Sequence, residues 1–444
     1  MTLLGDCHPR PVTALGSFLG ALLCLGGAAN AQEAGGLEAG LDVSQKFVFS
    51  ESETVSLSTL GFGLSSETRS QYLRFRVQGG YETSLEGTTA SGLVDPDYSL
   101  AYGTRNRNAA LDVSLAFTER DVDSIFELTE VPGVFVIDSG TRTSSRSSVQ
   151  LELGREAPFG ATIGLAYNII SYDGTTDPDL LDSRESEANV ALRFDIDRRI
   201  TARVDGSFSE VDSDGGTDVT RERVGVGADL QVTQTLAADV SVGVTRVTEG
   251  DAGTTTVQDG LSFGLTLSEE RPDGAWTASL TSDIDESGRR STLTLGRSLD
   301  LRDGRFSATI GVSEGDDGEL RPLYSLRYNA ELPNGSAGVV LDQSFDVNSS
   351  GFETLNTRLT ADWEYQLNRV SSLGAEVRLR QTDVLGGSGD SSRLDLSLTY
   401  VHALTDDWSL TSGYTHTLRR KDGEPDSSTD ELFIGLQTSF AWRP

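Results

Sequence analysis

The chain is short of several sequence features, and each shortage excludes a class of protein. Only 2 cysteines occur in 444 residues, both within the first 24 positions, so the rest of the chain can hold neither a disulfide nor a cysteine-ligated metal. No stretch reaches the ~20 consecutive apolar residues that a membrane helix needs, which excludes a helical membrane protein. Lys and Arg number 36 against 68 Asp and Glu, and without a basic patch nucleic acid is excluded as a partner.

The first 31 residues have the features of a secretory signal. Arg10 precedes an apolar segment over 12–28, and Ala29-Asn30-Ala31 supplies the small-x-small cleavage pattern, so we expect cleavage before Gln32. A lipoprotein signal at Cys24 is the alternative, disfavoured because the preceding residue is the large Leu23. The sequence therefore divides into a cleaved signal peptide (1–31), a short periplasmic lead (32–40) and one further domain (41–444).

From residue 41 onward the sequence repeats one unit of about 10 to 14 alternating residues followed by a break. Ten breaks are short turns and eleven are longer polar loops that are often acidic, and the two kinds alternate along the chain. These connections join about 22 strands, within a range of 20 to 24, and an even number suits a closed antiparallel sheet. The short turns lie at 67–70, 105–108, 156–160, 195–199, 233–235, 270–274, 301–304, 332–335, 368–371 and 404–407.

The strands share one amphipathic pattern, as the segment RLDLSLTY at 393–400 shows. Leu394, Leu396, Leu398 and Tyr400 fall on one side of an extended strand, and polar residues fall on the other. A soluble sandwich of so many strands would exceed the usual size of open sheets and would need some strands that are apolar on both sides. The pattern therefore predicts an all-β fold, a single closed transmembrane β-barrel with short periplasmic turns and longer acidic extracellular loops.

All four tryptophans lie close to a short turn or to the end of the last strand. Trp276, Trp363, Trp408 and Trp442 would then rest at the lipid headgroups on the periplasmic side, as girdle residues of membrane barrels do. The alternative is that strand-end tryptophans cover a soluble core.

The last strand, LFIGLQTSFAW, alternates outward through Leu432, Ile434, Leu436, Phe440 and Trp442. In this strand and in the strand architecture of 41–444, the chain resembles Gram-negative outer-membrane β-barrel proteins of the porin type. Arg443 and Pro444 follow the aromatic end, where members of that group usually stop. The resemblance implies an integral protein of the bacterial outer membrane, with lipid and lipopolysaccharide around it and insertion by the barrel-assembly machinery through the last strand.

From this architecture we expect a porin-like channel for passive diffusion of small hydrophilic solutes. About nine residues separate the predicted cleavage site from the first strand, too few for a plug domain, so the chain itself would have to narrow the lumen. The alternative function is a non-transport surface barrel whose acidic loops bind cations, lipopolysaccharide or an exported polymer.

No enzyme activity, metal site or cofactor is expected. His402 and His416 fall on the apolar face, away from lumen carboxylates that could work with them. The Asp-rich loops match neither the spacing of an EF-hand nor a calcium β-roll repeat, so we interpret them as solvated loops.

Charged residues of both signs on the polar face are the candidate pore lining, because facing rows of charge would order small polar solutes. The alternative is that they form cross-strand ion pairs that fill a narrow or closed barrel. These residues are Arg74, Arg76, Arg193, Asp195, Arg223, Asp229, Asp283, Arg327, Arg358, Asp362, Glu364, Arg378, Arg380 and Asp395.

Two features depart from the regular pattern. The loop at 121–145 is unusually apolar and is either a constriction loop inside the lumen or a hairpin that extends above the membrane and turns at Pro132-Gly133. Arg297 falls in a lipid-facing series, where a charge at mid-membrane costs ~2 to 4 kcal/mol, so either it snorkels to the periplasmic edge or Gly296 marks a bulge that turns it inward. The candidate constriction residues are Ile125, Phe126, Leu128, Val134 and Phe135.

Overall fold

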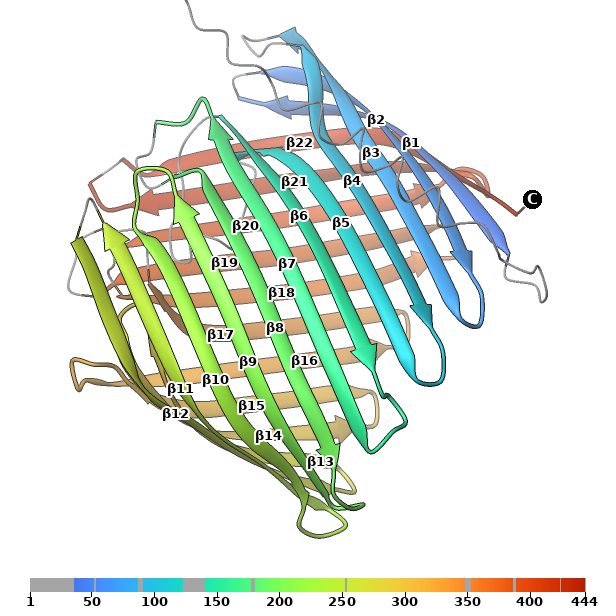
Figure 1. Cartoon of the computed structure of the whole chain (residues 1–444). Helices are drawn as coiled ribbons and strands as arrows, with labels where there is room; N and C mark the ends of the chain where they lie inside the picture. The colour runs from blue at the N-terminus through green and yellow to red at the C-terminus, as the bar shows by residue number, and fades with distance from the viewer. Residues whose placement is uncertain are drawn as a thin grey trace, which may run out of the picture.

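A computed structural model shows one closed sheet, in which β3–β12 lie toward the viewer and β13–β22 lie behind them (Figure 1). It describes residues 36–51, 53–86, 91–122, 140–176, 180–251, 254–347, 353–385, 389–423 and 425–443. The predicted signal peptide lies outside the described residues. The first eleven strands are β1 (Leu37–Ser50), β2 (Thr54–Glu67), β3 (Gln71–Glu86), β4 (Gly92–Arg105), β5 (Ala109–Asp121), β6 (Thr141–Leu153), β7 (Phe159–Asp173), β8 (Ser183–Asp195), β9 (Ile200–Ser213), β10 (Asp218–Gln231) and β11 (Leu236–Asp251).

The second half of the chain continues the same up-and-down path, and each strand pairs antiparallel with the strand before it. No helix among the described residues is long and apolar enough to cross a membrane. The remaining strands are β12 (Thr254–Arg271), β13 (Gly274–Asp285), β14 (Gly288–Leu301), β15 (Gly304–Glu314), β16 (Leu320–Leu332), β17 (Gly335–Val347), β18 (Glu353–Asn368), β19 (Ser371–Val384), β20 (Ser391–Ala403), β21 (Trp408–Lys421) and β22 (Ser427–Trp442).

The sheet closes because the last strand pairs with the first. The β1–β22 register runs from Ala39↔Trp442 to Ser50↔Glu431, so both strands use their second edge. Closure leaves the backbone groups of the first and last strands paired, which a barrel in hydrocarbon requires. The prediction of an all-β antiparallel barrel of 22 strands is confirmed.

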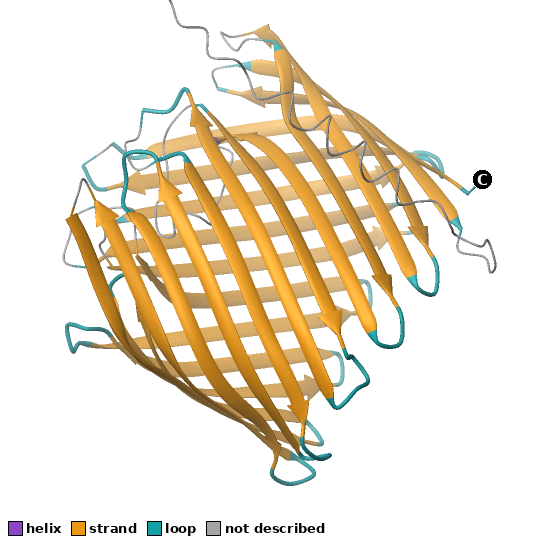
Figure 2. Ribbon diagram, in the orientation of Figure 1, coloured by secondary structure: helices purple, strands orange, loops and turns teal. Residues whose placement is uncertain are grey.

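The turn residues of the sequence set the strand ends. Every one of the ten predicted short turns connects two strands, and these turns lie together at one end of the barrel (Figure 2). The strand bounds differ from the prediction in three places. The first strand begins at Leu37 rather than at residue 41, and the connections at 252–253 and 286–287 have only 2 residues each although both were expected to be longer loops.

Apolar side chains cover the outside of the barrel. In β10, Val224 and Val226 are 66% and 57% exposed, while the alternate positions 223 and 225 belong to the other face, to which the Arg223 side chain points. Side chains on that other face contact residues of non-neighbouring strands, for example Arg203 of β9 with Asp239 of β11. Curvature of the wall brings side chains of non-neighbouring strands closer together on the concave side, and the apolar side chains are on the opposite, outer face, so the polar face lines the lumen.

Arg297 stays on the outer face and snorkels, and no bulge turns it inward. The registers with β13 and β15 run through Gly296 and Arg297 without interruption. Its guanidinium lies 5.1 Å from the centre of the Trp276 ring, and its Nη2 lies 2.7 Å from a carboxylate oxygen of Asp273 in the β12–β13 short turn. The charge therefore reaches the membrane edge instead of remaining in hydrocarbon.

Candidate functional site at the long-loop mouth of the lumen

The hairpin of β13 and β14 leaves the barrel wall near the end that carries the long loops. Its pairing with β12 runs from Arg271↔Gly274 to Phe263↔Ser282 and stops there, while β12 itself continues to Thr254. Residues 283–291 form the tip of this hairpin, and we refer to them as the β13–β14 tip.

The β13–β14 tip lies across the lumen side of β12. Asp283 accepts a hydrogen bond of 2.8 Å from Arg221 of β10 and one of 2.7 Å from Thr245 of β11, so it reaches past β12 to the two strands beyond. Ile284 is only 4% exposed, and Arg289 donates a 2.8 Å hydrogen bond to the backbone carbonyl of Leu261. The tip therefore narrows the lumen mouth, a role that the sequence did not predict for it.

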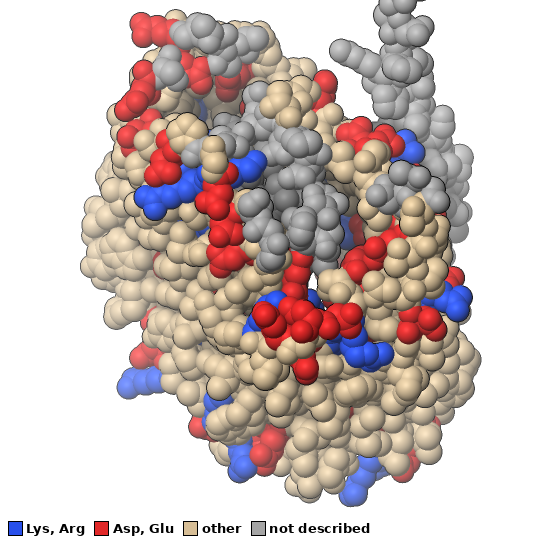
Figure 3. Space-filling model, turned by 90° about the vertical axis from the view of Figure 1, so that its left-hand side faces the viewer, with Lys and Arg blue, Asp and Glu red and all other residues tan. Residues whose placement is uncertain are grey.

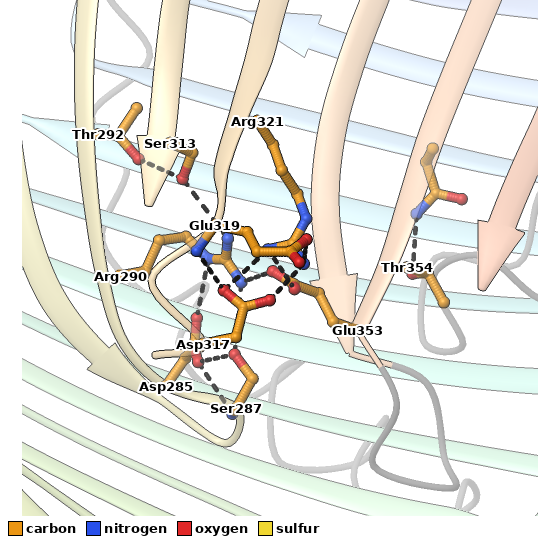
Figure 4. A network of polar contacts seen from close by, with 11 residues as sticks. Asp285, Ser287, Arg290, Thr292, Ser313, Asp317, Glu319, Arg321, Glu353 and Thr354 are labelled. Atoms are coloured by element: carbon orange, nitrogen blue, oxygen red, sulfur yellow. Dashed lines mark hydrogen bonds and ion pairs between the residues drawn. The ribbon is translucent and has the colours of Figure 1, made fainter. Parts of the chain in front are cut away.

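A network of ion pairs joins this tip to the next hairpins (Figure 4). Glu353 of β18 pairs with Arg290 of the tip and, at 3.0 Å, with Arg321 of β16. Arg321 also pairs with Asp317 in the β15–β16 loop, and Arg290 Nε lies 3.5 Å from an oxygen of Asp285. The hydrogen bond from Arg321 lowers the pKa of Asp317, which favours the charged form of the loop carboxylate.

The ends of β17 and β18 also lie on the lumen side of their neighbours. By alternation along β17 and β18, Phe345 and Glu353 belong to the series of residues that faces outward closer to the short turns. At the mouth, however, they contact the lumen-facing side chains of Arg290 and Arg321. The Arg290 guanidinium lies 4.9 Å from the centre of the Phe345 ring. Pairing between β16 and β17 correspondingly begins only at Ser325↔Asp342. The lumen mouth is thus narrowed by two inward-turned hairpins linked through Glu353.

A row of arginines crosses four neighbouring strands, starting on β18, the strand that also carries Glu353. Arg358 of β18 stands opposite Arg380 of β19, Arg380 opposite Arg393 of β20, and Arg393 opposite Arg419 of β21. We call these four residues the arginine row. Arg380 and Arg393 are 3% and 6% exposed, so the row contains buried charge. Like charges that are directly opposite in a sheet repel one another, so the row concentrates positive charge on this part of the wall.

The positions next to the row add more positive than negative charge. On one side the lumen-facing series carries Arg378 and Asp395, and on the other side it carries Lys421. Asp395, 3% exposed, accepts a 2.8 Å hydrogen bond from Arg393 and lies 3.7 Å from Arg378. Within these three levels of the four strands there are therefore six cationic side chains and one carboxylate, in a chain whose net charge is -32.

All fourteen predicted lining residues fall on the lumen-facing series, but they do not form one site. Arg358, Arg378, Arg380 and Asp395 come together at the arginine row. Asp229 pairs instead with Arg203 near the short turns, and Asp283 is held by the contact with Arg221. The others are distributed along the wall: Arg74, Arg76, Arg193, Asp195, Arg223, Arg327, Asp362 and Glu364.

Sequence reasoning missed Arg393, Arg419 and Lys421 as members of the same cluster, although all three are on the polar series. A signal was present, because a short turn fixes which residues stand opposite one another in a hairpin. The turn at 404–407 therefore determines that Arg393 faces Arg419. The candidate constriction residues Ile125, Phe126, Leu128, Val134 and Phe135 lie outside the described residues, so both interpretations of that loop stay predictions.

The two histidines lie on the lipid-facing series, as predicted. His402 shares a 2.8 Å hydrogen bond with Ser371, and His416 shares one of 2.8 Å with Asp430. Acidic side chains gather on the side of the barrel that carries the long loops (Figure 3). Within the described ranges no three His, Cys, Asp or Glu side chains are grouped so that they could hold a metal ion.

No known protein family model matches the chain, and no curated protein matches its sequence. Solved structures do match its fold. The siderophore receptor PirA from Acinetobacter baumannii is 9% identical with a TM-score of 0.58, and the match covers 92% of this chain and 81% of the receptor. The ferripyoverdine receptor of the outer membrane of Pseudomonas aeruginosa is 11% identical with a TM-score of 0.57, covering 92% and 72%. The copper transporter OprC is 11% identical with a TM-score of 0.56, covering 92% and 81%.

These matches confirm the fold of an outer-membrane β-barrel, and with the apolar outer surface they confirm an integral outer-membrane protein. The prediction of a porin-like channel for passive diffusion is wrong. Barrels of about 16 to 18 strands leave an open aqueous channel, whereas about 22 strands is the size of outer-membrane transporters with a filled lumen. The similar structures are receptors and a transporter.

Proposed function

We propose that the chain is an outer-membrane barrel of the uptake-receptor kind that holds a small anionic ligand at the arginine row. The arginine row is the observation that carries this proposal. The fold supports it, because the similar structures include receptors named for a siderophore and for ferripyoverdine and a transporter named for copper. The proposal gives the chain no catalytic role and no resident cofactor.

The chemistry of the row favours an anion with several oxygen atoms. A guanidinium group presents its N–H donors in a planar fork that matches carboxylate or phosphate oxygens, and it stays charged at every physiological pH. Strands lie ~4.8 Å apart, so the four arginines span about 14 Å along one level of the wall. A ligand with two or three negative groups could contact neighbouring arginines at once. A small anionic metal chelate has these properties.

The row is also placed where a ligand would arrive. Arg393 and Arg419 are each the third residue from the long-loop end of their strands. The acidic loops around the mouth are repulsive to anions, so the row would bind an anion that passes them and would discriminate against cations that the loops attract. Selectivity would then arise because a solute meets the negative charge of the acidic loops first and the positive charge of the arginine row second.

Equilibrium dialysis of radiolabelled citrate against refolded residues 32–444 at low ionic strength tests the proposal. We expect saturable binding that weakens as salt is added, and no binding of the uncharged polyol xylitol. The double variant Arg380→Gln/Arg393→Gln should weaken citrate binding at least tenfold, because it removes two adjacent guanidinium groups.

A matched control removes the same charge elsewhere. Arg302 and Arg305 lie at the short-turn end and are 94% and 71% exposed, so Arg302→Gln/Arg305→Gln should bind citrate as the parent does. Absence of citrate binding by a correctly folded barrel would refute the proposal. An equal loss in the control variant would refute it as well, because binding would then follow total charge alone.

A further inference from the structure

The sequence alternation of β13 continues beyond the point where its pairing with β12 stops. After Ser282, the last paired residue, come Asp283, Ile284 and Asp285, which still alternate between polar and apolar. If the register Phe263↔Ser282 were simply extended, Asp283 would stand opposite Ser262 and Ile284 opposite Leu261. We call this arrangement the wall position of the β13–β14 tip, and the observed arrangement the tucked position.

In the wall position, Ile284 and Asp283 would each stand opposite a residue of matching polarity on β12. Leu261 is 63% exposed, and in the wall position Ile284 would lie beside it on the apolar outer surface, whereas now Ile284 is buried on the lumen side. The Ser262 hydroxyl is buried and makes no hydrogen bond, and in the wall position it would face the Asp283 carboxylate on the lumen side. Residues on both strands thus fit a pairing that the structure does not make.

Polar contacts hold the tucked position in place of the missing ladder. The contacts are those of Asp283 with Arg221 and Thr245, of Arg289 with the Leu261 carbonyl and of Arg290 with Glu353. The Leu261 carbonyl belongs to the part of β12 that β13 no longer pairs with, and there the Arg289 guanidinium donates the hydrogen bond to it. Each of these contacts would break when the tip moves outward, while ladder hydrogen bonds would form between residues 283–285 and 260–262.

We infer that the β13–β14 tip is a gate with two positions, tucked across the lumen mouth or paired with β12 in the wall. The tucked position narrows the mouth and the wall position widens it. Two packings of the same residues that exchange one set of polar contacts for another are the kind of bistable element on which switching depends. This inference does not depend on the proposed ligand, since it concerns only the pairing of β12 and β13.

Gly260 offers a direct way to shift the balance. A Cβ atom at this position would lie 2.6 Å from Arg289 Nη2 and 2.9 Å from Ile284 Cδ1, so alanine would displace the ends of these two side chains and weaken their contacts in the tucked position. In the wall position the same Cβ would point into the lumen beside Asp285. Gly250, on β11 near the same end of the barrel, has no atom within 4 Å of an added Cβ and is the matched control.

Cysteine alkylation reports the position of the tip. Refolded residues 32–444 contain no cysteine, because the two of the chain are Cys7 and Cys24, so Ile284→Cys introduces a single thiol. In the tucked position this thiol is shielded, and in the wall position it is on the outer surface. We expect N-ethylmaleimide to modify Ile284→Cys at least tenfold faster when Gly260→Ala is added, and at an unchanged rate when Gly250→Ala is added.

A second variant removes a polar contact of the tip instead of changing the packing at Gly260. Arg221→Gln removes the ion pair with Asp283 from the β10 side, and we expect it also to accelerate modification of Ile284→Cys. Each variant is first shown to be folded by its heat-modifiable migration on a gel. Modification that stays slow in both folded variants would overturn the gate and would make the tip a fixed constriction. Acceleration by Gly250→Ala to the same degree would overturn it too.

Discussion

At the scale of single residues, local partners make an isolated charge on the lipid-facing surface tolerable. Arg297 has a side chain only 16% exposed, stacked on Trp276 and paired with Asp273. The aromatic face and the carboxylate take the place of water around the guanidinium, so the charge is compensated at the headgroup level. The choice between a snorkelling side chain and a bulge could not be made from the sequence, because it depends on the neighbouring strand that carries Trp276 and on the turn that carries Asp273.

This arrangement predicts a change in the titration of Asp273. The hydrogen bond from Arg297 lowers the pKa of Asp273 below its ordinary value of 3.8, so the stabilisation from this pair is present above 3.8 and is lost as the pH falls through the lowered pKa. We expect the pKa of Asp273 to rise in Arg297→Met, as measured by carboxyl-carbon NMR titration of the refolded barrel. Arg302→Met, in the next short turn, should leave it unchanged. Equal values in Arg297→Met and the parent would contradict the pairing.

At the scale of elements, some lumen-facing arginines serve the turns instead of the pore. Arg193 of β8 donates hydrogen bonds of 2.9, 3.2 and 3.1 Å to the carbonyls of Gly154, Arg155 and Ala157 in the β6–β7 turn. Three carbonyls of a turn that has little ladder pairing are thereby satisfied by one side chain. The predicted role of Arg193 in lining a pore is therefore secondary to its role in holding this turn.

Replacement of Arg193 should destabilise the barrel. Arg193→Leu removes the Nη2 group, whose two N–H hydrogens serve all three carbonyls, and because the side chain is partly exposed, water replaces part of this bonding, so we expect a loss of about 1 kcal/mol in the free energy of unfolding. Urea unfolding of the barrel in lipid vesicles, followed by tryptophan fluorescence, measures this loss. Arg198→Leu, in the next short turn, is the control and should unfold as the parent does. Coincident unfolding curves for the parent and Arg193→Leu would show that the contacts carry no stability.

The positions of the turns were predictable because their residues act locally. Pro272-Asp273-Gly274 and Pro333-Asn334-Gly335 fix tight turns through their own backbone preferences, and the structure has strand ends at both. The inward turn of the β13–β14 tip was not predictable. The alternation through Ile284 and Asp285 points to a strand in the wall, whereas the contacts that favour the other position include Arg221 and Thr245, which are far away in the sequence.

At the scale of the whole molecule, closure is the property on which every other feature depends. It could be predicted from an even number of amphipathic strands, whereas the arginine row could not, because it arises from registers across three hairpins. The predicted contacts with lipopolysaccharide and the barrel-assembly machinery stay predictions.

Closure can be trapped by a disulfide between the first and last strands. Ser44 of β1 stands opposite Gln437 of β22, so Ser44→Cys/Gln437→Cys should form a cross-link in the refolded barrel and resist heat-induced opening on a gel. Thr411 is one strand further away, on β21, and Ser44→Cys/Thr411→Cys should remain reduced. Cross-linking of the second pair but not the first would mean that the β1–β22 register is wrong.

Hydrocarbon covers the apolar face of these strands, and water fills the inside of the barrel. A nitroxide scan of residues 222–229 along β10 in lipid vesicles tests this arrangement by comparing relaxation by oxygen with relaxation by a water-soluble nickel complex. We expect oxygen to dominate at Val224 and Val226 and nickel to dominate at Arg223 and Gly225, with a period of two residues. Dominance of nickel at every position would mean that water reaches both faces of β10 and would contradict a barrel that spans the membrane.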